Sequence, residues 1–163
     1  MSDVTWKVAR FDELDARDVH DLLRLRQDVF VVEQDCVFHE IDGRDPVAWH
    51  LLGRRDDRLV AYARVFEPGI VGAEASIGRV VTDPSVRGSG LGHALFKEAM
   101  KLVERIAPGA AIRLAAQHHL ERFYGAYGFV GVGDRYIEDG IYHLDMVRSA
   151  DASASAPPTA PAS

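Results

Sequence analysis

The chain has 163 residues, 47% of them hydrophobic, and Cys36 is its only cysteine. This length allows one domain with a buried core, and a lone cysteine excludes a small fold held together by internal disulfides. The net charge of −6 argues against a nucleic-acid partner and favours a cationic small substrate. The N-terminus lacks a basic segment before an apolar run, and no apolar run approaches the ~20 residues of a membrane span. We therefore expect a soluble cytoplasmic protein with no membrane partner.

The first part of the chain predicts a strand, a helix and a long loop. Residues 4–11 alternate well enough for a strand, and Asp12 or Asp15 can cap the helix that follows. One face of that helix gathers Val19, Leu22, Leu23, Arg26 and Phe30. The polar stretch at residues 33–46, which contains glycine and proline, predicts a loop whose length is typical of functional segments.

Three strands are predicted next. Residues 48–54 and 59–66 flank an aspartate-rich turn and predict an antiparallel hairpin, and residues 74–82 predict a further strand. Arg64 and Arg79 lie inside these apolar strands, where a charge is costly unless it is paired or faces water. We expect both to pair with carboxylates, and the candidate partners are Glu33, Asp42, Glu138 and Asp139.

The middle of the chain predicts a helix and a parallel strand. Residues 91–106 show helical spacing, with a buried side predicted at Ala94, Leu95, Ala99, Leu102, Val103 and Ile106. Residues 111–116 are short and apolar, as in a buried strand. Because a helix separates them from the strand at residues 77–82, we expect these two strands to pair in parallel.

The last part of the chain predicts a closing hairpin and a tail. A short helix through Tyr127 precedes two strands, at residues 129–132 and 142–147. From residue 149 the sequence turns to alanine, serine and proline. We therefore expect a single domain over residues 1–148 and a disordered tail over residues 149–163.

A glycine-rich loop after the strand at residues 77–82 indicates a function. The loop comprises Arg87, Gly88, Ser89, Gly90, Leu91 and Gly92. Its glycines let backbone N–H groups approach a ligand at a helix start that favours anions, so it suits a pyrophosphate. His93 and Ala94 follow where a nucleotide triphosphatase loop needs Lys and Ser or Thr, and the G-x-G-x-G spacing differs from the dinucleotide fingerprint G-x-G-x-x-G.

The pattern Arg-Gly-x-Gly-x-Gly behind a Val-Val strand resembles the acetyl-coenzyme A (acetyl-CoA) loop of the GNAT acyltransferase superfamily. Residues 120–129, in which Phe-Tyr is followed three residues later by Gly-Phe, resemble a later signature of that superfamily. Further strings resemble the ElaA-like group of bacterial GNAT proteins; they occupy residues 29–34, 40–43, 50–53, 77–80 and 138–141. The resemblance covers nearly everything before residue 149.

This resemblance implies an α/β fold: a central mixed sheet of about seven strands, flanked by helices, with parallel fourth and fifth strands that splay apart. It implies acetyl-CoA as cofactor, with its pyrophosphate on the glycine-rich loop and its pantetheine arm along Val80, Val81 and Thr82. Gln117 stands where many relatives carry an Asn that contacts the pantetheine, so that contact is expected to be altered.

Acetyl transfer to an amine needs a neutral nucleophile, stabilisation of the oxyanion and a proton for the departing thiolate. The resemblance implies Tyr124 as the general acid and a backbone N–H near Val80 as the oxyanion donor. The alternative for Tyr124 is a core side chain packed with Phe123 and Phe129. Glu74 stands where some GNAT enzymes carry a catalytic glutamate. Alternatives for the base are His118, His119, His143, or a water chain to Glu33 or Asp139.

The acceptor implied is a primary amine of a small molecule or peptide. Residues expected to bind it are Glu33, Asp42, Arg79 and Asp139, with Glu40 also nearby; the alternative for the loop acids is a solvated surface. No spaced set of His, Cys and Asp predicts a metal site. A homodimer, a non-catalytic acyl-CoA sensor and an acyl-homoserine-lactone-synthase-like transferase stay open, although the last needs an S-adenosylmethionine site that we do not find.

Overall fold

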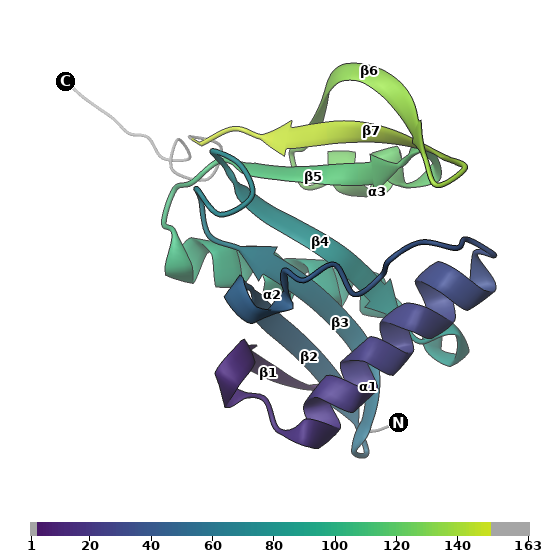
Figure 1. Cartoon of the computed structure of the whole chain (residues 1–163). Helices are drawn as coiled ribbons and strands as arrows, with labels where there is room; N and C mark the ends of the chain where they lie inside the picture. The colour runs from purple at the N-terminus through teal and green to yellow at the C-terminus, as the bar shows by residue number, and fades with distance from the viewer. Residues whose placement is uncertain (1–2, 151–163) are drawn as a thin grey trace. The chain divides into compact units, whose positions relative to one another are not determined.

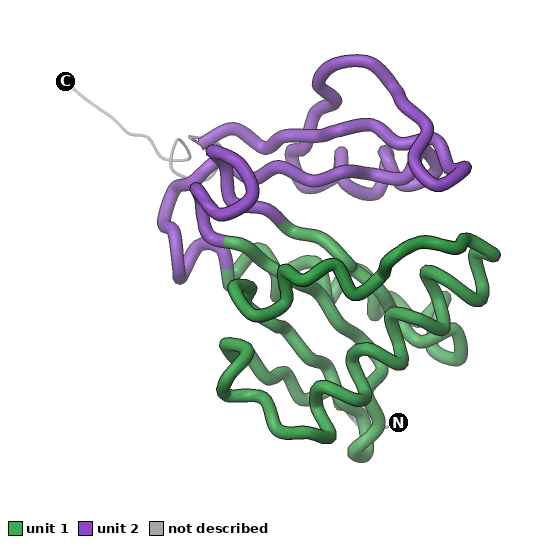
Figure 2. Tube along the Cα trace, viewed as in Figure 1, with its two compact units in different colours: residues 1–66, 77–102 green, residues 67–76, 103–163 purple. Residues whose placement is uncertain are grey.

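The computed structural model describes residues 3–150, so the predicted tail lies outside the described residues from position 151 onward. The chain divides into two compact units. Unit 1 comprises Met1–Phe66 and Ile77–Leu102, and unit 2 comprises Glu67–Ser76 and Val103–Ser163 (Figure 2). In the part of the chain that the structure describes, no helix is both long enough and apolar enough to cross a membrane.

Seven strands form one mixed sheet in the order β1-β2-β3-β4-β5-β7-β6. They are β1 (Thr5–Arg10), β2 (Trp49–Arg55), β3 (Arg58–Phe66), β4 (Ala75–Thr82), β5 (Ile112–Gln117), β6 (Val130–Glu138) and β7 (Ile141–Arg148). The pair β4 and β5 is parallel, whereas β1–β2, β2–β3, β5–β7 and β6–β7 are antiparallel. The predicted mixed sheet with parallel fourth and fifth strands is confirmed.

The helices are α1 (Ala16–Arg26), α2 (Leu91–Ile106) and α3 (Glu121–Gly125), with a π-helix η2 (Gln27–Glu33) directly after α1. Single 3-10 turns are η1 (Phe11–Glu13), η3 (Asp45–Val47), η4 (Pro84–Val86) and η5 (His118–Leu120). Within unit 1, α1 crosses one face of β2 and β3 (Figure 1).

The first helix begins at a capping box, in which the Asp15 carboxylate accepts from the Asp18 backbone N–H at 2.7 Å. Its buried face differs in part from the predicted one. Leu22 and Arg26 are buried as expected, but the other buried positions are Asp18, Leu25 and Val29. The predicted Val19, Leu23 and Phe30 are half-buried. The π-helical turns after Arg26 explain part of the shift, because they hold more residues per turn and so rotate the later side chains.

The hairpin of β2 and β3 is confirmed. Its turn residues, Asp56 and Asp57, have φ values of 51° and 65°, as a type I′ turn requires. Gly53 in β2 is required by packing, because a Cβ there would lie 2.6 Å from the Trp6 ring.

The second helix spans Leu91–Ile106, the bounds that the sequence predicts. Of its predicted face, Leu95, Ala99, Leu102 and Val103 are buried. Ala94 is exposed, with Phe96 buried in its place, so the prediction was wrong there, and the predicted Ile106 is only half-buried. Phe96 continues the apolar stripe toward Ala99 and Val103 at helical spacing, whereas Ala94 lies beside it.

The last hairpin is longer than predicted. β6 runs to Glu138, whereas the prediction ended at residue 132. An irregularity between Val132 and Tyr136, with Gly133 at φ 74°, interrupts the alternation of its side chains. Its turn residues, Asp139 and Gly140, have φ values of 52° and 79°. Because of this interruption, the alternation of side chains did not predict the second half of the strand.

Candidate functional site

The glycine-rich loop of unit 1 has the backbone that an anion site needs. Gly88 and Gly90 both have φ 82°, a conformation that other residues adopt only with strain, and a Cβ on either would meet nothing within 4 Å. The loop therefore has open space above its backbone. It leads directly into α2, and the first N–H groups of a helix lack partners within the helix and point to its positive end.

Arg87 at the start of this loop is paired. Its two terminal nitrogens donate to the two Glu33 carboxylate oxygens at 2.5 and 2.6 Å, in an exposed fork. Hydrogen bonds from Arg87 lower the pKa of Glu33. Glu33 was expected beside the acceptor, and the structure places its carboxylate on the glycine-rich loop.

Strand β4 changes conformation next to the predicted oxyanion donor. Arg79 has φ 50°, which is uncommon for a residue with a Cβ, and it directly precedes Val80. The register with β5 comprises only Ala75 with Ile112 and Ser76 with Arg113. The residues from Val80 to Thr82 lie outside that register, in agreement with the predicted splaying of the two parallel strands.

Three arginines and three carboxylates form a network in unit 1, which we call the arginine cluster. Its members are Arg26, Arg64, Arg79, Glu40, Asp42 and Asp45. The side chain of Arg26 is fully buried and donates to Glu40 Oε2 and Asp45 Oδ1, at 2.5 and 2.9 Å. With three charges of each sign, the arginine cluster is formally neutral.

The two strand arginines of the cluster share its acids. Arg64 donates to Asp42 Oδ2 at 2.7 Å and to Asp45 Oδ1 at 2.9 Å. Arg79 donates to Glu40 Oε2 at 2.8 Å, and its Nη2 lies 3.6 Å from Asp42 Oδ2.

Burial alone would raise the pKa of Asp42 and of Asp45. Burial is the largest single effect at both carboxylates, but the opposing effects together outweigh it, so both pKa values are lowered. At Asp42 these are the hydrogen bonds from Arg64 and the Arg44 backbone and the nearby arginine charges, and at Asp45 they are the hydrogen bonds and charges of Arg26 and Arg64.

The predicted pairing of Arg64 and Arg79 with carboxylates is confirmed, and Asp42 is the one predicted partner that makes it. The prediction missed Glu40 and Asp45 as partners and gave Arg26 no partner. Two features could have found them: a charge on the apolar face of the first helix, and three acids within residues 40–45 of the following loop.

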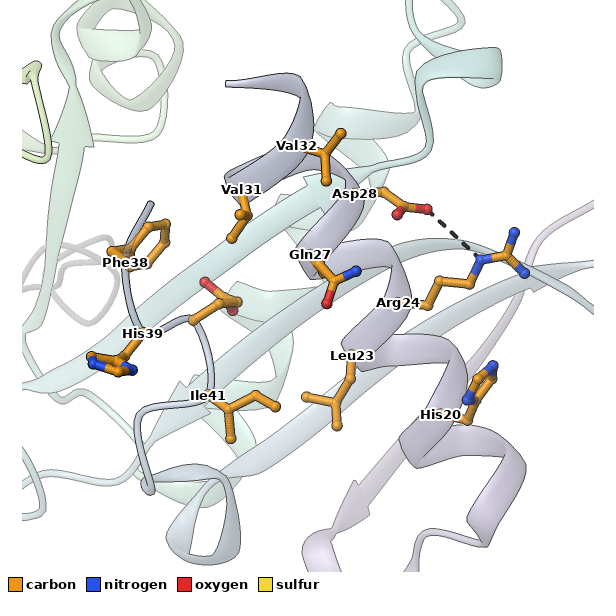
Figure 3. A pocket seen from close by; sticks show the side chains of 11 residues that line it. His20, Leu23, Arg24, Gln27, Asp28, Val31, Val32, Phe38, His39 and Ile41 are labelled. Carbon is orange, nitrogen blue, oxygen red and sulfur yellow. Dashed lines mark ion pairs between the residues drawn. The ribbon is translucent and has the colours of Figure 1, made fainter. Parts of the chain in front are cut away.

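An open pocket of about 930 Å³ lies beside the arginine cluster. Side chains from α1 and η2 face those of residues 38–41 across it (Figure 3). Its lining comprises His20, Leu23, Arg24, Gln27, Asp28, Val31, Val32, Phe38, His39, Glu40 and Ile41. Of the acids expected near an acceptor, Glu40 is thus the one that lines this pocket.

In unit 2, Tyr124 lies in α3 and is 7% exposed. Its ring makes edge contacts with Phe123 at 5.2 Å and Phe129 at 6.4 Å between centroids. Burial raises the pKa of Tyr124 to about 12, so its hydroxyl keeps its proton at neutral pH. The packing expected of a core residue and the protonation expected of a general acid therefore occur in the same side chain.

The remaining predicted residues of unit 2 are more exposed. Glu74, just before β4, has its carboxylate 3.9 Å from Arg113, which donates to Asp145 at 2.7 Å. Gln117 is the last residue of β5 and is half-buried. Asp139 is exposed in the turn between β6 and β7.

Comparisons with known proteins agree on one family. The model of a protein family described as "Acetyltransferase (GNAT) domain" matches residues 26–150. Protein ElaA of Escherichia coli is 37% identical over 147 residues, which are 89% of this chain and 96% of that protein. The UPF0039 protein sll0451 of Synechocystis is 40% identical over 146 residues, again 89% of this chain and 95% of that protein.

Solved structures agree with these matches. The crystal structure of Escherichia coli ElaA has a TM-score of 0.85 at 36% identity and covers 90% of this chain and 99% of its own. The structure of an acyl-CoA N-acyltransferase from Pseudomonas aeruginosa has a TM-score of 0.87 at 41% identity, with the same coverage of both chains.

Proposed function

From the premise that this chain belongs to the GNAT acetyltransferase family, in its ElaA-like group, we propose that it transfers an acetyl group from acetyl-CoA to a primary amine. The observation that carries the proposal is the glycine-rich loop. Gly88 and Gly90 take up φ 82° beneath open space, at the start of the 16-residue helix α2. The loop amides, with Arg87, would hold the pyrophosphate.

Each further role falls to a residue of this chain. Val80, Val81 and Thr82 offer a strand edge to the pantetheine arm, and Gln117 contributes a side-chain amide to it. Bound acetyl-CoA supplies a thioester whose carbonyl carbon can be attacked by the amine. The Val80 N–H stabilises the oxyanion, and the Tyr124 hydroxyl protonates the departing thiolate.

The proton of the amine and the binding of the acceptor involve acidic residues. Glu74 is the proposed base, oriented by Arg113 at 3.9 Å. Asp42 and Arg79 contribute to acceptor binding through the arginine cluster, with Asp139 as a further acceptor contact. Glu33, which Arg87 holds on the glycine-rich loop, positions Arg87 rather than the acceptor. The acceptor is a cytoplasmic small-molecule or peptide amine.

The test combines direct acetyl-CoA binding with thiol release over a panel of amines. Gly90→Val should weaken acetyl-CoA binding by about 10-fold or more, because the side chain blocks the approach to the backbone and strains a positive φ. Gly109→Val is the matched control, since Gly109 has φ 73° and equally open space but lies outside the loop. Equal affinity for both folded variants would contradict the pyrophosphate site.

Thiol release separates the enzyme from a non-catalytic acyl-CoA sensor. A sensor binds acetyl-CoA with the same loop but releases no thiol above the uncatalysed rate with any amine. Release that depends on the amine and saturates with its concentration supports the transferase.

A further inference from the structure

Glu40 is the one member of the arginine cluster that also lines the open pocket. Its Oε2 atom accepts from Arg26 at 2.5 Å and from Arg79 at 2.8 Å. Its Oε1 atom is buried and has no hydrogen-bond partner among residues 3–150, and the side chain is only 6% exposed. A buried carboxylate oxygen without a donor is unfavourable, so a group in the pocket that donates to Oε1 would be stabilised there.

The walls of the pocket are largely apolar. Leu23, Val31, Val32, Phe38 and Ile41 contribute them. The exposed acid in the lining, Asp28, is already balanced by Arg24 at 3.8 Å (Figure 3). The pocket therefore offers a hydrogen-bond acceptor at Glu40 and an apolar surface around it, without an excess negative charge for a second cation.

The charge balance of the arginine cluster decides which form of an amine fits. Three guanidinium groups already neutralise three carboxylates, so an added ammonium would be an unbalanced charge in a partly buried place. A neutral amine adds only an N–H donor, and the neutral form is the one that can attack a thioester. Glu40 is also bonded to Arg79, the residue before the proposed oxyanion donor Val80.

We infer that this pocket binds the acceptor, and that the acceptor is a primary amine with an apolar body, aryl-alkyl or branched-alkyl, whose N–H donates to Glu40 Oε1. The inference rests on the proposed function. Polyamines fit less well, because each further ammonium would lie against Val31, Val32 or Ile41 without a carboxylate to pair with. Peptide lysines fit less well, because flanking backbone amides that lie against Leu23, Val31 or Val32 would lose their hydrogen bonds to water.

The first experiment compares substrates and a matched pair of variants of the full chain. Thiol release is measured with 2-phenylethylamine, isoamylamine, spermidine and a lysine-containing peptide. Val32→Asp places a charge in the apolar lining, and Val37→Asp makes the same change outside the pocket; the two valines are 65% and 96% exposed. We expect Val32→Asp to raise KM for 2-phenylethylamine at least ~10-fold and Val37→Asp to leave it unchanged.

The second experiment changes the carboxylate itself. In Glu40→Gln the amide oxygen faces Arg26 and Arg79, so the NH₂ group faces the pocket and meets the amine donor to donor. KM for 2-phenylethylamine should rise ~10-fold or more while acetyl-CoA affinity stays unchanged. If this variant does not fold, the comparison of KM between Val32→Asp and Val37→Asp still tests the inference.

The possible failures are distinguishable. Thiol release with spermidine or the peptide but not with apolar amines overturns the inference and leaves the proposed function standing. The same holds if Val32→Asp and Val37→Asp behave alike. If no amine releases thiol, the proposed function fails, and calorimetric titration of 2-phenylethylamine into the two valine variants still tests the pocket: equal binding overturns it, and loss only in Val32→Asp supports it.

Discussion

Arg26 in unit 1 and Tyr124 in unit 2 are polar side chains that are buried in different ways. In unit 1, the Arg26 guanidinium is fully buried and two carboxylates face it at 2.5 and 2.9 Å. In unit 2, Tyr124 is buried among aromatic rings, and burial alone raises its pKa to about 12. The charges of unit 1 are neutralised by one another, whereas Tyr124 stays neutral by keeping its proton.

This difference separates stability from chemistry. Removing one member of a buried charge network leaves an uncompensated charge in the interior and so destabilises the fold. The Tyr124 hydroxyl costs little to remove as a packing element, but under the proposed function it is the group that protonates the departing thiolate. Substitutions in the arginine cluster should therefore change stability, and substitution of Tyr124 should change turnover.

The largest expected effect is on turnover in Tyr124→Phe. This change keeps the ring and its contacts with Phe123 and Phe129 and removes the hydroxyl, which is the proposed proton donor. A positioned acid typically contributes 10²–10⁴-fold, so kcat should fall by roughly that factor while acetyl-CoA affinity and Tm change little. Steady-state thiol release and direct binding measure the two quantities.

Tyr127→Phe is the internal control for this prediction. Tyr127 also carries a pKa raised by burial, but it lies beyond the end of α3 and is more exposed than Tyr124. Its hydroxyl should matter far less for kcat. Full kcat in Tyr124→Phe, or a greater loss in Tyr127→Phe, would show that the proton donor is assigned wrongly.

The next largest effect is on stability in Asp45→Ala. Asp45 Oδ1 accepts from both Arg26 and Arg64 at 2.9 Å, so its loss leaves two buried guanidinium groups short of a partner. Removing one partner of a buried ion pair typically costs about 3–5 kcal/mol. Urea denaturation measures the loss. Asp28→Ala is the matched control, because the exposed pair of Asp28 with Arg24 at 3.8 Å should contribute under ~1 kcal/mol.

Much of the fold could be predicted because its signals are local. The turn at Asp56 and Asp57, the bounds of α2 and the parallel pairing of β4 with β5 follow from turn residues, spacing and connection length. The extent of β6 could not be predicted in this way, because a single irregularity near Gly133 changes which residues alternate.

The candidate site likewise contains one part that has local sequence signals and one part that lacks them. The glycine-rich loop could be located from the sequence because glycine spacing and a helix start occur within six residues. The partners of Arg26 could not, because Glu40 and Asp45 are 14 and 19 residues away and their approach depends on how the intervening loop folds. Long-range ion pairs leave no period in the sequence, only the anomaly of a charge on an apolar face.

A smaller loss of stability is expected for Arg79→Ala. This arginine pairs with Glu40 at 2.8 Å, but its side chain is 24% exposed, and Glu40 keeps Arg26 as a partner. The loss should therefore lie between the buried and exposed cases, at about 1–3 kcal/mol by urea denaturation. Arg58→Ala, which removes an arginine 62% exposed and paired with Asp83, should cost less. Equal losses for the two variants would mean that burial does not set the contribution of these strand arginines.

The smallest effect is expected in unit 2, for Arg113→Ala. Arg113 resembles Arg79 in lying in a strand with two carboxylates near it, Asp145 at 2.7 Å and Glu74 at 3.9 Å. Arg113 is 43% exposed, and its partners Glu74 and Asp145 are 27% and 29% exposed, so water solvates both carboxylates once the guanidinium is removed. Asp145 also keeps the Tyr136 hydroxyl at 2.6 Å. The expected loss is under ~1 kcal/mol. A loss as large as that of Asp45→Ala would show that the presence of an ion pair, rather than its burial, determines the loss of stability.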